Sequence, residues 1–247
     1  MKRLQRKLRK ACELYGLIES GDRVAVGVSG GKDSLALLAA LCEYRRYAPT
    51  PFEIEAVTLD PCFGGREADY SEITALCARY GVPHIVKRTN LAEVIFDIRK
   101  EKNPCALCAK MRRGALHDLS VENGCNKIAL GHHLNDVVET FFLNLFHEGR
   151  IAAFAPISYL SRKNLHLIRP LILCEEREIA NAVARSGLPV LKSACPMDGV
   201  SQRQTIKQFI VQKETEYPGF LNRTFTALQN GDVSGLKPLQ AGEPEHL

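Results

Sequence analysis

Residues 24–38 read VAVGVSGGKDSLALL, a run of apolar and β-branched residues that breaks into a glycine turn and then becomes helical. The apolar run predicts a buried strand, and two adjacent glycines let backbone N–H groups turn closely around an anion. The helix that follows adds its positive amino-terminal end. The stretch therefore predicts a phosphate-binding loop between a strand and a helix. Its chemistry-bearing residues are Ser29, Gly30, Gly31, Lys32, Asp33 and Ser34.

The spacing of this loop excludes two better-known phosphate-binding patterns. Gly27 and Gly31 are separated by three residues, whereas a Walker A loop needs four, and Asp33 follows the lysine where that loop has Ser or Thr. No GxGxxG pattern is present. The loop instead resembles the SGGxDS sequence of the PP-loop ATP pyrophosphatases. That resemblance implies an enzyme that splits ATP between its α and β phosphates and can adenylate a carbonyl oxygen.

Length and composition indicate one large domain. The chain has 247 residues, of which 45% are hydrophobic and 25% charged, so its core can be sizeable. No run of 18 apolar residues is present, and the first ten residues, MKRLQRKLRK, lack the apolar region of a signal peptide. We therefore expect a cytoplasmic protein that does not contact a membrane. In a reducing compartment the nine cysteines predict thiols or metal ligands rather than disulfides.

Strand-like and helix-like segments alternate through the first 150 residues. The expected strands are 23–28, 52–59, 84–88 and 127–130, and the expected helices are 34–47, 67–80, 108–122 and 135–147. This order predicts an α/β fold, an open parallel sheet with helices on both faces. In such sheets ligands bind beyond the carboxyl ends of the strands. Ser29, Asp60 and residues 131–133 each follow a different strand, so we expect them to meet in one crevice.

Two terminal segments are expected to flank the central domain. Residues 1–20 predict a basic helical extension, because their apolar residues are spaced as on one helical face. Residues 21–217 are expected to form the ATPase domain with its cysteine site. Residues 218–247 are rich in Gly and Pro and predict a loosely ordered tail, with an irregular packed arm as the alternative. The apolar residues of the first segment are Leu4, Leu8, Ala11 and Tyr15.

One cysteine pair, Cys105 and Cys108, lies at the start of an expected helix inside the basic stretch 99–113. A CxxC pair at a helix start holds two sulfurs close together, and the helix dipole and nearby arginines are expected to lower the thiolate pKa. The pair alone fits a redox site, half of a zinc site or part of an iron-sulfur site.

Cys195, in the Pro-flanked sequence KSACPMD, is the candidate third ligand. Three thiolates can hold a 4Fe-4S cluster with one open iron, or a closed zinc site if a histidine completes it. The conceivable fourth zinc ligands are His117, His132 and His133. The cysteines expected as small core residues are Cys12, Cys42, Cys77, Cys125 and Cys174, while Cys62 lies in a loop and is left unassigned.

Positive charge is unevenly spread, although the net charge is only +5. Six of the first ten residues are Lys or Arg, and residues 99–113 hold six Lys or Arg against one acid. Such patches suit a nucleic-acid backbone, and solvated helix faces are the alternative interpretation. Beside a phosphate loop and a cysteine pair, we expect nucleic acid.

Several stretches together resemble the TtcA branch of the PP-loop family, the tRNA 2-thiocytidine synthetases, over roughly residues 14–215. They are SGGKDS, CALCAKMRRG, ALGHHLNDVVETFFLNLF, LIRPL, and the lone Cys195 followed by SQRQTI. The resemblance implies an adenine nucleotide alpha hydrolase-like fold and an enzyme that uses ATP, Mg²⁺ and a 4Fe-4S cluster. It implies replacement of the C2 oxygen of tRNA cytidine 32 by sulfur, with release of AMP and pyrophosphate. Carried over, the cluster ligands are Cys105, Cys108 and Cys195. A sulfur donor such as a cysteine desulfurase and a homodimer are further expected partners.

The expected roles in the nucleotide site follow from side-chain chemistry. ATP should place its phosphates on the backbone of Gly30 and Gly31, with Lys32 and Ser34 on the pyrophosphate. Asp33 should help to place magnesium, which prefers oxygen ligands.

Residues after the other strands complete the expected crevice. Asp60 should receive the adenosine ribose or a magnesium-bound water, or else cap the next segment. Gly131 and His132 should line the nucleotide site, and His132 and Asp136 are expected four apart on one helical face, pointing at the crevice. Arg112 and Arg113 are expected to bind phosphate. The alternative partners of these arginines are Glu139 and Asp118.

Three alternative functions remain open. A lysidine synthetase, which also acts on tRNA with a PP-loop, needs no cysteine triad. A nucleotide-binding sensor with a redox cluster or zinc would bind ATP without releasing AMP. A small-molecule thiolase on the same site differs only in its substrate, since the basic patches alone argue for RNA.

Overall fold

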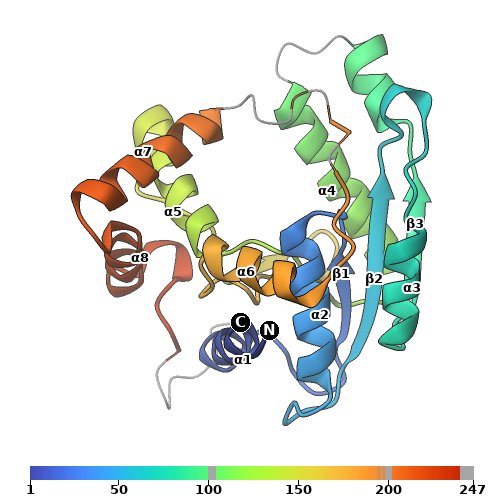
Figure 1. The fold of residues 1–247 in the computed structure, drawn as a ribbon, viewed down its shortest axis with the longest axis horizontal. Coiled ribbons are helices and arrows are strands. Elements are labelled where there is room, and N and C mark those ends of the chain that lie inside the picture. Colours follow the sequence, from blue (N-terminus) through green and yellow to red (C-terminus); the bar gives the residue numbers. More distant parts are fainter. Residues whose placement is uncertain (100–103, 193, 196, 198–201, 240–247) are drawn as a thin grey trace.

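The computed structural model describes residues 1–99, 104–192, 194–195, 197 and 202–239 (Figure 1). Its strands are β1 (Arg23–Gly27), β2 (Glu53–Asp60), β3 (His84–Arg88), β4 (Lys127–Ala129), β5 (Ile157–Leu160) and β6 (Leu165–Ile168). They form one sheet in the order β3-β2-β1-β4-β6-β5. All neighbours pair in parallel except β5 and β6, which form an antiparallel hairpin at one edge. The four expected strands and the parallel α/β fold are confirmed, whereas the hairpin was not predicted.

The helices cover both faces of the sheet. They are α1 (Lys2–Tyr15), α2 (Lys32–Arg45), α3 (Ser71–Arg79), α4 (Pro104–Glu122), α5 (Leu134–Leu143), α6 (Glu176–Ser186), α7 (Gln202–Glu216) and α8 (Phe220–Asn230). Short helical turns are η1 (Phe63–Gly65), η2 (Glu93–Ile98), η3 (Asn144–Glu148) and η4 (Val233–Gly235). Across the described ranges, no helix combines the length and the apolar character needed to cross a bilayer.

The strand order reverses between β1 and β4. From β1 the chain goes on to β2 and β3 on one side, whereas β4 and β6 lie on the other. The connections that leave β1 and β4 therefore diverge at this point, which is where open α/β sheets bind ligands. The phosphate loop follows β1 and the Gly131-His132-His133 sequence follows β4.

The amino-terminal helix is confirmed, but it is part of the core. Leu4 and Leu8 are 2% and 0% exposed, and α1 packs on α2 and α6. Its cations Arg3 and Lys7 reach Glu178 of α6 at 2.7 and 2.6 Å. The apolar stripe that predicted the helix thus faces the domain, so α1 does not extend away from it.

The carboxyl-terminal segment differs from the loosely ordered tail expected for residues 218–247. Helix α8 buries Leu221, Phe225 and Leu228, whose spacing of three and four residues marks one helical face. Beyond it, the Tyr15 hydroxyl of α1 donates to the Leu236 carbonyl at 3.0 Å. The flanking Gly and Pro residues concealed this pattern in the sequence. Residues 240–247 lie outside the described part of the chain.

Candidate active site

The phosphate loop has the strand-turn-helix geometry that its sequence predicts. Gly30 has a φ of 84°, in the left-handed region that favours glycine, and a Cβ there would lie 2.9 Å from Leu191 Cδ1. The Ser29 N–H donates to Ser34 Oγ at 3.2 Å, and the Ser34 hydroxyl donates to the Gly31 carbonyl at 2.9 Å. These bonds close the loop against the first turn of α2.

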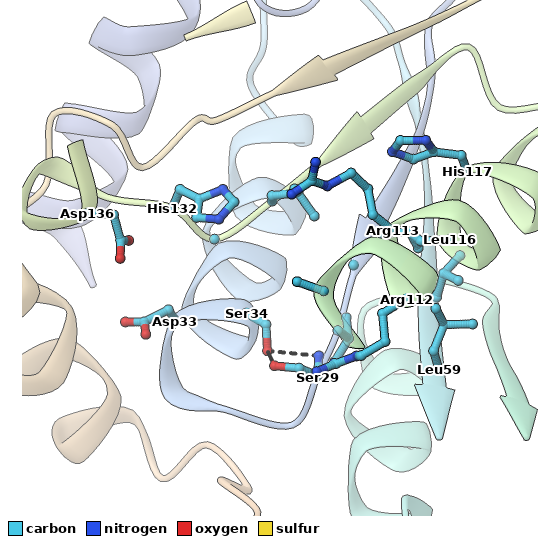
Figure 2. Close-up of a pocket in the computed structure, with 16 residues that line it drawn as sticks. Ser29, Asp33, Ser34, Leu59, Arg112, Arg113, Leu116, His117, His132 and Asp136 are labelled. Atoms are coloured by element: carbon cyan, nitrogen blue, oxygen red, sulfur yellow. Dashed lines mark hydrogen bonds between the residues drawn. The ribbon is translucent and has the colours of Figure 1, made fainter. Parts of the chain in front are cut away.

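A cavity of about 410 Å³ opens beside this loop, within the usual size range of small-molecule sites (Figure 2). Its polar lining residues are Ser29, Asp33, Ser34, Arg112, Arg113, His117, His132 and Asp136. Figure 2 shows the two carboxylates on one side and the arginines projecting from α4 on the other. The expected convergence of the segments after β1 and β4 is confirmed. Gly131 permits it, since a Cβ there would lie 3.0 Å from the Asp33 carbonyl carbon and oxygen.

Asp60 ends β2 but does not line this cavity. The residue is 2% exposed, and its carboxylate accepts hydrogen bonds from the N–H groups of Cys62 at 3.0 Å and Ala68 at 2.9 Å. In this structure Asp60 therefore fastens the loop after β2, which is the alternative role that the sequence left open. A contact between Asp60 and the nucleotide stays a prediction.

Lys32 belongs to a charged chain that the sequence analysis did not identify. Its Nζ lies 2.9 Å from the Asp33 carboxylate and 3.1 Å from Glu176 Oε1, at the start of α6. Lys207 of α7 reaches the same glutamate at 2.7 Å. Burial alone would raise the pKa of Glu176, but hydrogen bonds and charges from Lys207 and Lys32 outweigh it and lower that pKa to about 2. Glu176 is therefore ionised at neutral pH and links α6, α7 and the phosphate loop.

The expectation that His132 and Asp136 share one helical face is wrong, because α5 begins at Leu134 and His132 precedes it. His133, the N-cap residue, is the histidine between the two carboxylates. Its Nδ1 lies 3.4 Å from Asp136 Oδ2 and its Nε2 lies 3.8 Å from Asp33 Oδ1. Its backbone N–H also donates to Asp136 Oδ2 at 2.9 Å. The sequence signal was the capping pattern, with an acid three residues after the cap.

His132 lies on the cavity wall with its ring 5.1 Å from the ring of Phe154. Burial lowers the pKa of His132 to about 4, and the charges of Arg169 and Arg203 act in the same direction. At neutral pH this imidazole is therefore uncharged.

Arg169, from the LIRPL sequence, is a buried cation next to Phe154. It is 8% exposed, its guanidinium carbon lies 4.7 Å from the Phe154 ring centre, and it donates to the Ala155 carbonyl. Burial and the charge of Arg113 lower the pKa of Arg169 to about 10. Arg169 lies behind the lining residues, while Arg112 and Arg113 line the cavity itself and give it positive charge, which suits an anionic ligand.

The alternative partners of Arg112 and Arg113 are engaged elsewhere. Asp118 pairs with Lys163 at 2.6 Å, and Glu139 pairs with Arg203 at 3.0 Å. Both arginines instead line the cavity. Lys100 and Lys102, from the same basic stretch, lie outside the described residues.

The three candidate ligand cysteines lie at the same end of the molecule. Cys105 and Cys108 occupy the first turns of α4, and the segment after α6 that carries Cys195 runs up toward this end of α4 (Figure 1). Burial raises the pKa of Cys108, and the charges of Cys195 and Cys105 raise it further, while Arg112 opposes them. The expectation of a lowered pKa is therefore wrong for Cys108, although the charge effects of Cys105 and Cys195 indicate that both lie near it.

Among the described residues, no group of three or more His, Cys, Asp or Glu side chains is arranged to hold a metal ion. The cysteine ligand set stays a prediction, as does its completion by a histidine. The five cysteines expected in the core are all buried, as predicted, and Cys62 is half-buried.

Comparison with known proteins places these features in a family context. Residues 1–214 match the PP-loop domain model. The tRNA-cytidine(32) 2-sulfurtransferase of Syntrophotalea carbinolica is 40% identical over 235 residues, which cover 92% of this chain and 90% of that protein. The protein of the same name from Methylococcus capsulatus is 40% identical, covering 93% and 79%. Among solved structures, the U34-tRNA thiolase NcsA from Methanococcus maripaludis with its 4Fe-4S cluster is 26% identical, with a TM-score of 0.73 and coverage of 93% and 78%.

Proposed function

Because this chain belongs to the PP-loop domain family, and within it to the tRNA-cytidine(32) 2-sulfurtransferases, we propose that it is an ATP-dependent tRNA thiolase. It adenylates the C2 carbonyl oxygen of cytidine 32 and replaces that oxygen with sulfur. One observation carries the proposal. Arg112 and Arg113 of α4, the helix that carries Cys105 and Cys108, line the cavity beside the phosphate loop, and Cys195 is close enough to Cys108 for their charges to interact.

The nucleotide half of the reaction uses the loop and the residues around it. ATP lies with its phosphates on the backbone N–H groups at the start of α2, where the helix dipole favours negative charge. Lys32 neutralises the departing pyrophosphate, and the Asp33 carboxylate offers magnesium the oxygen ligands it prefers. The C2 oxygen attacks the α phosphate and pyrophosphate leaves, so AMP becomes the leaving group of the second step.

The cavity wall positions the base. Neutral His132 accepts or donates one hydrogen bond without adding charge, and Asp136 is held at the rim by His133. Arg112 and Arg113 attract the phosphates of the RNA. A tRNA-modifying role also implies a cytoplasmic protein.

The donor set fits an iron-sulfur cluster, since thiolates are the soft ligands that such clusters use and Cys108 interacts electrostatically with both Cys105 and Cys195. Cys105, Cys108 and Cys195 would hold the 4Fe-4S cluster, which would supply the sulfur chemistry of the second step. A cysteine desulfurase as sulfur donor and assembly into a homodimer stay predictions from the sequence.

The test is anaerobic purification with measurement of iron, acid-labile sulfide and zinc, followed by assay of AMP release and thiocytidine formation on tRNA. We expect about four iron and four sulfide per chain in the wild type. Cys105→Ser and Cys195→Ser should lose the cluster and the thiocytidine. Cys62→Ser, a half-buried thiol outside the proposed ligand set, is the matched control and should keep both.

Zinc in place of iron, or undiminished turnover in both serine variants, contradicts the proposal. Continued AMP release on tRNA without the cysteines would favour the lysidine-type reaction. Binding of ATP with no AMP release would favour a sensor.

A further inference from the structure

The connection between α6 and α7 carries Cys195, and its amino-terminal part is fastened to the phosphate loop. The Leu191 N–H donates to the Gly30 carbonyl at 2.9 Å. The side chain of Leu191 occupies the space where Gly30 lacks a Cβ. A shift of the loop therefore displaces a residue only four positions before Cys195.

The residues that follow this connection contact α5, whose Asp136 lines the same cavity. Arg203, in the first turn of α7, lies 3.0 Å from Glu139 Oε2 and 3.5 Å from Asp136 Oδ1. It also donates to Thr140 Oγ1 at 3.3 Å. One planar guanidinium thus contacts three side chains in the first two turns of α5, including the carboxylate at the cavity rim.

Glu139 makes this attachment strong. The residue is 4% exposed, and burial raises the pKa of its carboxyl while Arg203 acts against that change. Separating Arg203 from Glu139 would leave a buried carboxyl without its charged partner, which is energetically unfavourable.

A third attachment lies one turn further along α7. Lys207 binds Glu176 at 2.7 Å, and Glu176 also reaches Lys32 of the phosphate loop at 3.1 Å. Leu191, before Cys195, therefore contacts the phosphate loop directly, and Lys207, after it, reaches Lys32 of that loop through Glu176.

We propose that Arg203 is a positioning residue that aligns Asp136 and couples nucleotide binding to the position of Cys195. The proposal deepens the proposed function, from which it takes the roles of Asp136 and Cys195. Its physical basis is linkage: if ATP binding changes the state of Cys195 by way of Leu191 and Arg203, a change at Cys195 must alter the affinity for ATP by the same coupling factor.

The test needs neither the cluster nor tRNA. The cluster-free full-length protein is alkylated with iodoacetamide, with and without saturating α,β-methylene ATP, and peptide mass spectrometry follows the rates at Cys195 and, for reference, at exposed Cys105. In the wild type we expect the analogue to change the Cys195 rate about fivefold relative to Cys105. In Arg203→Gln, we expect the analogue to bind and the ratio to stay within about twofold of unity.

Two further variants keep this test decisive. Arg203→Lys retains one cation for Glu139 but lacks the planar fork, and it should keep part of the response even if the glutamine variant unfolds. Arg223→Gln, at an exposed position on α8, should respond like the wild type.

Two results would overturn the inference: no change at Cys195 in wild-type protein saturated with the analogue, or an equal change in Arg203→Gln. The outcome is separable from that of the proposed function. A protein that thiolates tRNA without this response refutes only the coupling, and one that shows the response without thiolating tRNA refutes only the reaction.

Discussion

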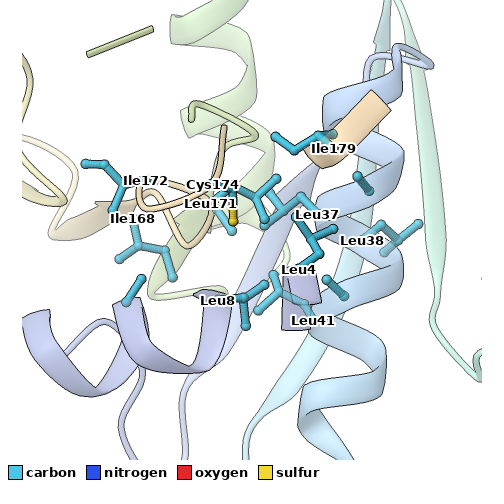
Figure 3. Packing of buried hydrophobic residues seen from close by; sticks show 14 of the residues in the cluster. Leu4, Leu8, Leu37, Leu38, Leu41, Ile168, Leu171, Ile172, Cys174 and Ile179 are labelled. Atoms are coloured by element: carbon cyan, nitrogen blue, oxygen red, sulfur yellow. The ribbon is translucent and has the colours of Figure 1, made fainter. Parts of the chain in front are cut away.

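Helices α2 and α4 begin at the same edge of the sheet, yet they are built differently. Residues 34–42 of α2 are all buried, packed between the sheet and the helices α1 and α6 (Figure 3). In α4 only Leu116, Leu119 and Ser120 are buried, and the turns with the cysteines are exposed or half-buried. The phosphate loop therefore leads into a helix that is packed on several sides, whereas the cysteines lie on a helix end with little packing around it. A binding site on α4 must obtain its geometry from its ligand and from distant segments.

The largest effect should come from emptying the core behind the phosphate loop. Leu37 of α2 is 0% exposed, and Leu37→Ala should lower the free energy of unfolding by about 3 kcal/mol because it leaves a cavity. Leu107 is half-buried near the start of α4, so Leu107→Ala should lower the free energy of unfolding by less than about 1 kcal/mol. Urea unfolding measures both. Equal losses would show that the two helices are packed alike.

The next effect concerns the cavity wall between the two helices. Burial lowers the pKa of His132 to about 4, below its usual value of 6.5, so the unfolded chain binds this proton first as the pH falls. Stability should be full above about pH 6.5 and decline toward pH 4 by an amount on the order of 2 kcal/mol. The measurement is urea unfolding of the wild type and His132→Gln from pH 7 to 4. Parallel pH curves for the two proteins would contradict the assignment.

A loss of similar size is expected where β4 meets the start of α2. A Cβ at Gly131 would lie 3.0 Å from the Asp33 carbonyl group and 3.1 Å from the Ser34 nitrogen. Backbone atoms cannot move away as a flexible side chain can. Gly131→Ala should therefore lower the free energy of unfolding by about 2 kcal/mol and weaken binding of an ATP analogue. Denaturant unfolding and calorimetric titration measure the two effects. Wild-type affinity in this variant would mean that the contact does not shape the site.

The smallest effect has the opposite sign and lies on α4. Gly114 is inside that helix, and a Cβ there would meet nothing within 4 Å. Gly114→Ala should therefore raise the free energy of unfolding by about 0.5 to 1 kcal/mol, the difference in helix propensity. A thermal melt tests this directly. A lower melting temperature would indicate that other residues pack on α4 at Gly114. That result would contradict the difference in burial between α4 and α2.

Local patterns allowed much of the fold to be predicted. The phosphate loop, the first four strands and α1 each depend on spacing within a few residues. The β5–β6 hairpin was missed because its strands have four residues each, and α8 was missed because glycines and a proline flank it. Asp136 was expected beside His132, whereas the structure places it beside His133. Helical spacing does not apply to His132, because α5 begins only at Leu134.

By itself the sequence determined the strand-turn-helix of the phosphate loop, the α/β alternation and the identity of the candidate ligands. These depend on backbone freedom and on apolar periodicity, which act between near neighbours. Only the tertiary structure decided that Glu176 joins Lys32, that Arg203 holds Asp136, and that Cys195 comes near Cys108. Those contacts join residues far apart in the chain, where no local spacing applies. The pKa shifts of Cys108 and His132 also depend on the tertiary structure, because burial is their largest cause.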